Sequence, residues 1–213
     1  CVILRHDIDN SLPQALRLAE IEADEGVKST WFVLLRTDFY NPASASAQKT
    51  LRCIRELGHE IGLHFDEMAY SGEDGIEPCA NFSIEEHIRY EADVLADICG
   101  CPITTVSMHR PSKATLEADL EIPGMVNSYG KTFFHDFKYL SDSRRWREPV
   151  EDIIRGGEYD RLHILTHAFW YHERERDITE SVGAFIRSAN AERYEQMMEN
   201  ITDLPSILPK GEL

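Results

Sequence analysis

The sequence is poor in basic residues. Its 213 residues contain 22 lysines and arginines against 38 aspartates and glutamates, which gives a formal net charge of -16 at pH 7. No basic cluster offsets this acidity, which argues against nucleic acid or an anionic membrane surface as a partner. The chain has no apolar run of membrane-spanning length and no recognisable signal peptide. A cytoplasmic location is therefore the default expectation, although the chain starts without Met inside a predicted strand.

Cysteines are also few and irregularly spaced. The five cysteines lie at positions 1, 53, 79, 99 and 101. An odd number without regular spacing does not indicate a disulfide framework. Cys99 and Cys101 could supply one edge of a metal site, but no second pair completes a tetrahedral set. We therefore expect reduced cysteines that pack as small apolar side chains.

The sequence also has no glycine-rich phosphate-binding loop after any predicted strand. A dinucleotide site is therefore not supported. The chain instead alternates β-rich and helical segments. Strands are predicted at residues 2–4, 27–35, 59–64, 103–109 and 162–167, with two shorter ones within 124–140. Helices are predicted at residues 12–23, 51–57, 83–99, 150–154 and 182–201.

This alternation predicts an α/β fold with a parallel sheet, either open and doubly wound or closed as a barrel. Seven strand candidates in 213 residues are slightly few for a regular eight-fold barrel, which takes roughly 250 residues. The length, with no linker or internal repeat, predicts a single domain over residues 1–213. Residues 71–82 are predicted to be a loop, and Pro205 and Pro209 to end the ordered chain.

Two carboxylates follow the first apolar run. Because side chains alternate between the faces of a strand, Asp7 and Asp9 point the same way. Neighbouring carboxylates repel each other and are costly to desolvate, and a bound cation or one shared proton is the usual remedy. The start of the chain is therefore a candidate active site.

Three histidines stand at the ends of other predicted strands. They are His64, His109 and His167. In barrels and open α/β sheets, functional sites lie at the carboxyl ends of the strands. One aspartate with two histidines is a mixed nitrogen and oxygen donor set, which suits Zn²⁺ or a neighbouring divalent metal and leaves positions open for water and substrate.

Four blocks of the sequence carry a resemblance to a known family. They are RHDID at residues 5–9, STWFV at 29–33, GHEIGLH at 58–64 and LTH at 165–167. Together they resemble the polysaccharide deacetylases of the NodB-homology type, carbohydrate esterase family 4. The resemblance implies a deformed (β/α)7 barrel that hydrolyses acetamide groups on amino sugars. It also implies one divalent metal ion, with zinc expected and cobalt, nickel, iron or manganese as alternatives.

The resemblance also implies roles for individual residues. Asp7 resembles the family's general base and Asp9 its metal-binding aspartate, while His64 matches the first histidine of the H-x-x-x-H metal motif. His167 matches the histidine that acts as general acid.

Further roles follow from the same resemblance. Arg110 falls where the family has an arginine that orients the base. Asp142 and Trp146 resemble the Asp-and-Trp motif that steadies the catalytic histidine and lines the pocket. Trp170, Tyr171 and Trp146 are candidate faces for stacking on a sugar ring, with packing in the core or at the rim as the alternative.

The chain departs from the family pattern at one metal ligand. The second histidine of the metal motif would fall at position 68, where this chain has Met68, and a thioether is a poor ligand for a hard divalent ion. Three alternatives follow: His109 supplies the third ligand, Asp66 or Glu67 supplies it, or no metal is bound. We favour His109, because a residue at a strand end is better held than one in a loop.

Three functions therefore compete with removal of an N-acetyl or other N-acyl group from an amino sugar. The first is hydrolysis of cyclic amides or ureido compounds on the same fold. The second is a catalytically inactive, sugar-binding barrel, for which Met68 is the main argument. A phosphoesterase is the weakest, because the sequence shows no second cluster for a two-metal site.

Overall fold

The computed structural model describes residues 1–70, 83–143, 145, 146 and 148–212, and the chain forms two compact units, residues 1–171 and 172–213. The sequence predicted one domain over residues 1–213. The sheet and all the candidate site residues belong to the first unit. Residues 71–82, predicted to be a loop, lie outside the described residues.

The first unit is built on a parallel sheet of seven strands, in the order β5-β4-β3-β2-β1-β7-β6. The strands are β1 (Val2–Ile8), β2 (Thr30–Leu34), β3 (Glu60–Asp66), β4 (Thr105–His109), β5 (Val126–Asn127), β6 (Lys138–Ser141) and β7 (Leu162–Thr166). Successive strands are neighbours except β5 and β6, and β7 returns to pair with β1. This is the cyclic order of a seven-stranded barrel opened between β5 and β6, which confirms the predicted fold class and excludes the doubly wound alternative.

Six α-helices belong to the described part of the first unit. They are α1 (Leu12–Asp24), α2 (Ala45–Glu56), α3 (Ile84–Cys99), α4 (Lys113–Glu117), α5 (Lys131–His135) and α6 (Val150–Gly156). Two of these helices begin with side-chain caps: the Ser11 hydroxyl accepts from the Gln14 N–H, and Ser83 with Glu86 forms a reciprocal capping box. The sequence did not predict α4 and α5, which are only five residues each.

The second unit consists of α7 (Ile178–Met198), α8 (Leu204–Ile207) and a 3₁₀ helix, Lys210–Glu212. The expectation that Pro205 ends the order is wrong. Proline fits the first turn of a helix, where its missing N–H is not needed, and Pro205 lies in the first turn of α8. No helix among the described residues is long and apolar enough to span a membrane.

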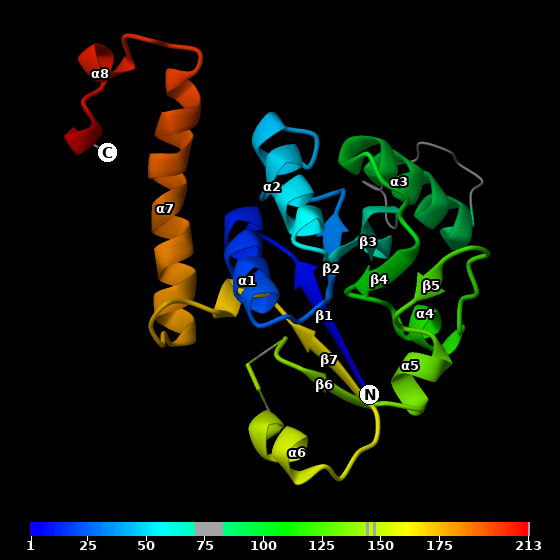
Figure 1. The fold of residues 1–213 in the computed structure, drawn as a ribbon. Coiled ribbons are helices and arrows are strands. Elements are labelled where there is room, and N and C mark those ends of the chain that lie inside the picture. Colours follow the sequence, from blue (N-terminus) through cyan, green and yellow to red (C-terminus); the bar gives the residue numbers. More distant parts are fainter. Residues whose placement is uncertain (71–82, 144, 147, 213) are drawn as a thin grey trace. The chain divides into compact units, whose positions relative to one another are not determined.

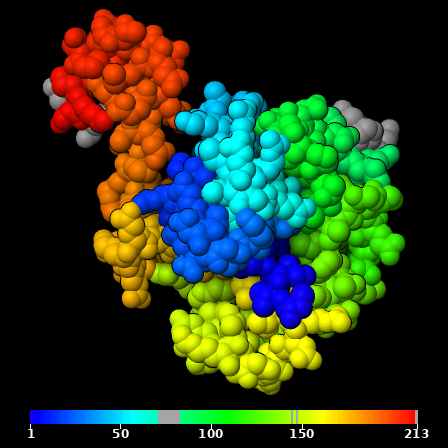
Figure 2. Space-filling model, viewed as in Figure 1, coloured from blue at the N-terminus to red at the C-terminus, as the bar shows by residue number. Residues whose placement is uncertain are grey.

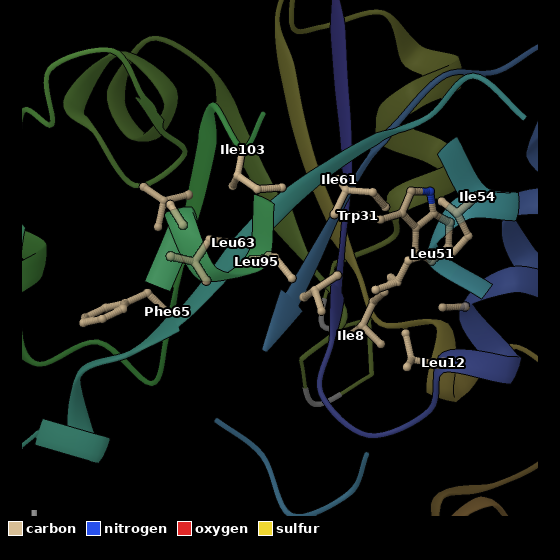
Figure 3. Packing of buried hydrophobic residues seen from close by; sticks show 14 of the residues in the cluster. Ile8, Leu12, Trp31, Leu51, Ile54, Ile61, Leu63, Phe65, Leu95 and Ile103 are labelled. Carbon is tan, nitrogen blue, oxygen red and sulfur yellow. The ribbon is translucent and has the colours of Figure 1, made fainter. Parts of the chain in front are cut away.

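The outer face of the sheet packs against α1, α2 and α3 (Figure 1). Alternate residues of β2 and β3 contribute to this core, as with Trp31 and Val33 of β2, and β1 contributes Ile8. Figure 3 shows Trp31 beside Leu51 and Ile54 of α2. In Figure 2 the three helices adjoin as blue, cyan and green surfaces. The alternate residues of the same strands therefore face inward, where the polar side chains gather.

Candidate active site

Three donor side chains converge at the carboxyl ends of β1, β3 and β4. His64 Nε2 lies 3.3 Å from Asp9 Oδ1, and His109 Nδ1 lies 3.5 Å from the same oxygen. The two imidazole nitrogens are 3.1 Å apart. These residues form the group whose donor atoms all lie within 4.8 Å of one another. The structure thus brings together the aspartate and both histidines that the sequence nominated as metal ligands.

The spacing of the donors fits a tetrahedral ion. Ligands at about 2.0–2.1 Å from a tetrahedral Zn²⁺ lie about 3.3–3.4 Å from one another. The three separations of 3.1, 3.3 and 3.5 Å bracket this value. Asp9 Oδ1 is buried without a hydrogen-bond partner, as expected of an oxygen whose partner is a metal ion. Three protein donors leave a fourth position open, which is the arrangement of catalytic zinc sites.

The backbone around the donors is firmly held. His64 Nδ1–H donates to the Ser107 carbonyl at 3.3 Å, which turns Nε2 toward the other donors. The buried Tyr40 hydroxyl donates to the Ile8 carbonyl at 2.7 Å and accepts from the Leu34 N–H at 3.0 Å. Tyr40 therefore ties the end of β1, just before Asp9, to the end of β2.

Charges within the triad influence one another. Burial disfavours the imidazolium of His64, but the carboxylates of Asp7 and Asp9 outweigh burial and raise the pKa of His64. Burial opposes ionisation of Asp9, but the imidazole of His64 beside it outweighs burial, so the pKa of Asp9 is lowered. Burial and the neighbouring His64 lower the pKa of His109. The triad therefore contains an ionised carboxylate, that of Asp9, and one imidazole, that of His109, whose neutral form is favoured.

Asp7 lies next to the triad and contacts Arg5. Its Oδ1 is 3.5 Å from Arg5 Nη1, its Oδ2 is 3.7 Å from His64 Nε2, and the Ser107 hydroxyl donates to both oxygens at 3.3 Å. Arg5 also donates to the Ser107 and Ser128 hydroxyls. The buried guanidinium is thus the cation that compensates the Asp7 carboxylate.

This arrangement corrects the expectation that Arg110 orients Asp7. Arg110 instead pairs with Asp66, on the neighbouring β3. Sequence reasoning missed Arg5, although alternation along the strand places it on the same face as Asp7 and Asp9.

His167 and Asp142 form a second pair beside the triad. His167 Nδ1 donates to Asp142 Oδ1 at 2.6 Å, and the His167 backbone N–H donates to both carboxylate oxygens at 3.1 Å. His167 Nε2 lies 3.8 Å from Asp9 Oδ2. Burial disfavours the imidazolium, but Asp142, Asp7 and Asp9 outweigh it and raise the pKa of His167. The pair is therefore suited to donating a proton from Nε2.

The candidate stacking aromatics have different surroundings. Trp146 is half-buried and packs against the cluster of Leu140, Leu162 and Ile164. The ring of Trp170 lies 5.8 Å from the Arg145 guanidinium. Burial and the nearby Asp142 carboxylate raise the pKa of the Tyr171 hydroxyl. Tyr171 therefore lies close to the carboxylate that holds His167.

Comparisons with known proteins give matches of structure. Neither a protein-family model nor a curated protein sequence matches the chain. A family 4 acetyl xylan esterase from Clostridium thermocellum, solved in complex with a cobalt ion, matches 90% of this chain and 84% of its own, at 18% identity and a TM-score of 0.46. A polysaccharide deacetylase from Bacillus cereus matches 90% of this chain and 87% of its own, at 14% identity and a TM-score of 0.49. A family 4 pseudoenzyme from Bacillus anthracis matches 90% of this chain and 60% of its own, at 14% identity and a TM-score of 0.47. The chain is thus similar in structure, at low sequence identity, to these two enzymes and to this pseudoenzyme.

Proposed function

We propose that this protein is a metal-dependent hydrolase that removes an acetyl or other N-acyl group from an amino sugar of a polysaccharide or its precursor. The observation that carries the proposal is the donor triangle of Asp9, His64 and His109, whose edges fit a tetrahedral divalent ion. Asp7 and His167 each lie close to a donor residue of this triangle, at 3.7 Å from His64 and 3.8 Å from Asp9, as an acid–base pair around one reacting centre requires.

The ion fits the chemistry that an amide requires. Two imidazoles and one carboxylate suit zinc, and cobalt, nickel, iron and manganese accept the same donors. When bound, the ion supplies Lewis-acid chemistry, which polarises the acyl carbonyl and makes a water more acidic. Each of the remaining steps falls to side chains of this protein.

Asp7 and His167 move the protons. The Asp7 carboxylate takes a proton from the attacking water, while Arg5 holds that carboxylate in place. His167 Nε2–H then gives a proton to the leaving nitrogen as the C–N bond breaks, and Asp142 holds the opposite ring nitrogen. The products are a carboxylic acid and a free amine. General acid and base steps each contribute on the order of 10²–10⁴ in rate.

Two variants test the assignment. Asp7→Asn should keep the metal and lose turnover by about 10²-fold or more, because only the proton acceptor is removed. His64→Ala should lose metal and turnover together, whereas His135→Ala on α5, which lies outside the triad, should keep both. Metal content by elemental analysis and hydrolysis of N-acetylated amino sugars are the two measurements. Near-normal turnover in Asp7→Asn would refute the role of Asp7.

A substrate panel separates the alternatives. N-acetylated amino sugars, their longer N-acyl analogues, cyclic amides and ureido compounds are offered to the same metal-loaded protein. Turnover of the cyclic compounds alone would assign the site to the cyclic-amide reaction. Protein that takes up no zinc and cleaves none of these compounds is the inactive barrel that Met68 suggests, and the proposal then fails.

A further inference from the structure

The segment after β4 is clamped to residues at the end of β3. Arg110 Nη2 donates to Asp66 Oδ2. Glu67 Oε1 accepts from the Ser112 backbone N–H, and Glu67 Oε2 accepts from the Thr115 hydroxyl. Two consecutive carboxylates therefore hold two points of the segment that joins β4 to α4 and one point of α4 itself.

His109 depends on this segment for its place. It is the last residue of β4, and its Cα pairs in register with Asp66. In the described part of the chain, the polar contacts of the His109 ring are with Asp9 and His64, the other members of the triad. The ring therefore has no separate polar anchor behind it there, and its position follows from the backbone.

The backbone just after His109 is in an unfavourable conformation. Arg110 has a φ of 50°, in the left-handed region, which is unfavourable for a residue with a side chain. Such a conformation persists only when surrounding contacts impose it. The ion pair of Arg110 with Asp66 and the two hydrogen bonds of Glu67 are contacts of this kind.

We propose that Asp66 and Glu67 are positioning residues for the third metal donor, His109. They lie two and three residues after His64, so a single stretch of chain supplies one donor directly and holds another through its carboxylates. The carboxylate of Glu67 is committed to Ser112 and Thr115, which makes it a support for the site and not a ligand. This inference rests on the metal site of the proposed function.

Zinc affinity of the metal-free protein is the direct test, measured by competition with a chromophoric chelator. Glu67→Ala removes both hydrogen bonds and should weaken zinc binding by about 10–100-fold, the usual effect of losing a supporting partner. Glu67→Gln should stay within about threefold of the parent, because its amide oxygen accepts from Ser112 and its amide N–H donates to the Thr115 oxygen. Glu117→Ala, an exposed carboxylate of α4 paired with Lys113, is the matched control and should leave the affinity unchanged.

A double-mutant cycle shows whether Glu67 acts through His109. His109→Ala should weaken zinc binding, and adding Glu67→Ala to it should cause no further loss. Loss of affinity in Glu67→Gln as large as in Glu67→Ala would make Glu67 a ligand and overturn the proposal. Additive losses in the cycle, or parent-like affinity in Glu67→Ala, would overturn it as well.

Separate control experiments test the folding of the variants and the proposed function. Circular dichroism of each metal-free variant verifies the fold, and Thr115→Val, which removes one of the two hydrogen bonds, takes the place of Glu67→Ala if that variant does not fold. Thr115→Val should weaken zinc binding and Thr115→Ser should restore it; equal affinity in the two would overturn the proposal. Zinc binding by the parent without hydrolysis of any substrate would refute the proposed function and leave the clamp standing, whereas a parent that binds no zinc refutes both.

Discussion

Replacing Arg5 with methionine should destabilise the protein by about 3–5 kcal/mol, the cost of removing one partner of a buried ion pair. The Arg5 and Asp7 side chains are 1% and 3% exposed, and their charged groups lie 3.5 Å apart. Methionine retains an apolar stem between the rings of Phe32 and Tyr129, which lie 5.6 and 4.8 Å from the guanidinium. Asp7 would keep the Ser107 hydroxyl but lose the guanidinium. A loss of this size is a fifth or more of the stability of a typical domain, about 5–15 kcal/mol.

Urea unfolding at pH 7, followed by circular dichroism, measures the loss. The double variant Arg5→Met/Asp7→Asn contains neither charge, so its destabilisation should be at least about 1 kcal/mol less than the sum of the two single losses. Arg155→Met, at an exposed pair with Glu151 on α6, is the control and should leave the stability unchanged. Losses that add to within about 0.5 kcal/mol would refute the coupling of Arg5 with Asp7.

Three further predictions concern other parts of the first unit. Burial, aided by the charge of Arg5, lowers the pKa of His163 to about 4. The unfolded chain, whose histidine pKa is about 6.5, therefore binds this proton first as the pH falls. Stability that is present above pH 6.5 is lost as the pH falls toward 4, by about 3 kcal/mol. Urea unfolding at a series of pH values should show a shallower loss of stability in His163→Gln, and an equal dependence of stability on pH in the two proteins would contradict the reasoning. Asp142→Asn should lower the pKa of His167, as read from NMR titration of the metal-free protein, and an unchanged pKa would remove Asp142 as its support. Gly62→Ala should cost about 1–3 kcal/mol in thermal or urea unfolding, because the new methyl group would lie 2.6 Å from the Phe32 ring; parent-like stability would show that this ring can move aside.

The candidate metal ligands were predictable because their signal is local. Asp9, His64 and His109 each follow an apolar run that predicts a strand, and parallel strands bring their carboxyl ends to one edge. The choice of His109 over Asp66 or Glu67 rested on the same rule, and the structure gathers His109 into the donor triangle.

The partners of these residues were less predictable because they depend on register between strands. Arg110 contacts Asp66 because β3 and β4 align Asp66 with His109, a long-range alignment that no local pattern specifies. Arg5 shares a face with Asp7, but the sequence does not show that the inner face of the sheet is sealed enough to bury a guanidinium. Placement of a cation beside Asp7 required the three-dimensional structure.

The pairing of β1 with β7 has a consequence for how the protein is made. His6 of β1 contacts Thr166 of β7 across 160 residues of chain. At a synthesis rate of about 5–20 residues per second, β1 has left the ribosome roughly 8–30 s before this partner exists. During that time one edge of β1 is unpaired, and unpaired strand edges are prone to wrong association. His167 is the last of the proposed catalytic and metal-binding residues to be made, so this part of the site is completed only when almost all of the first unit has been synthesised.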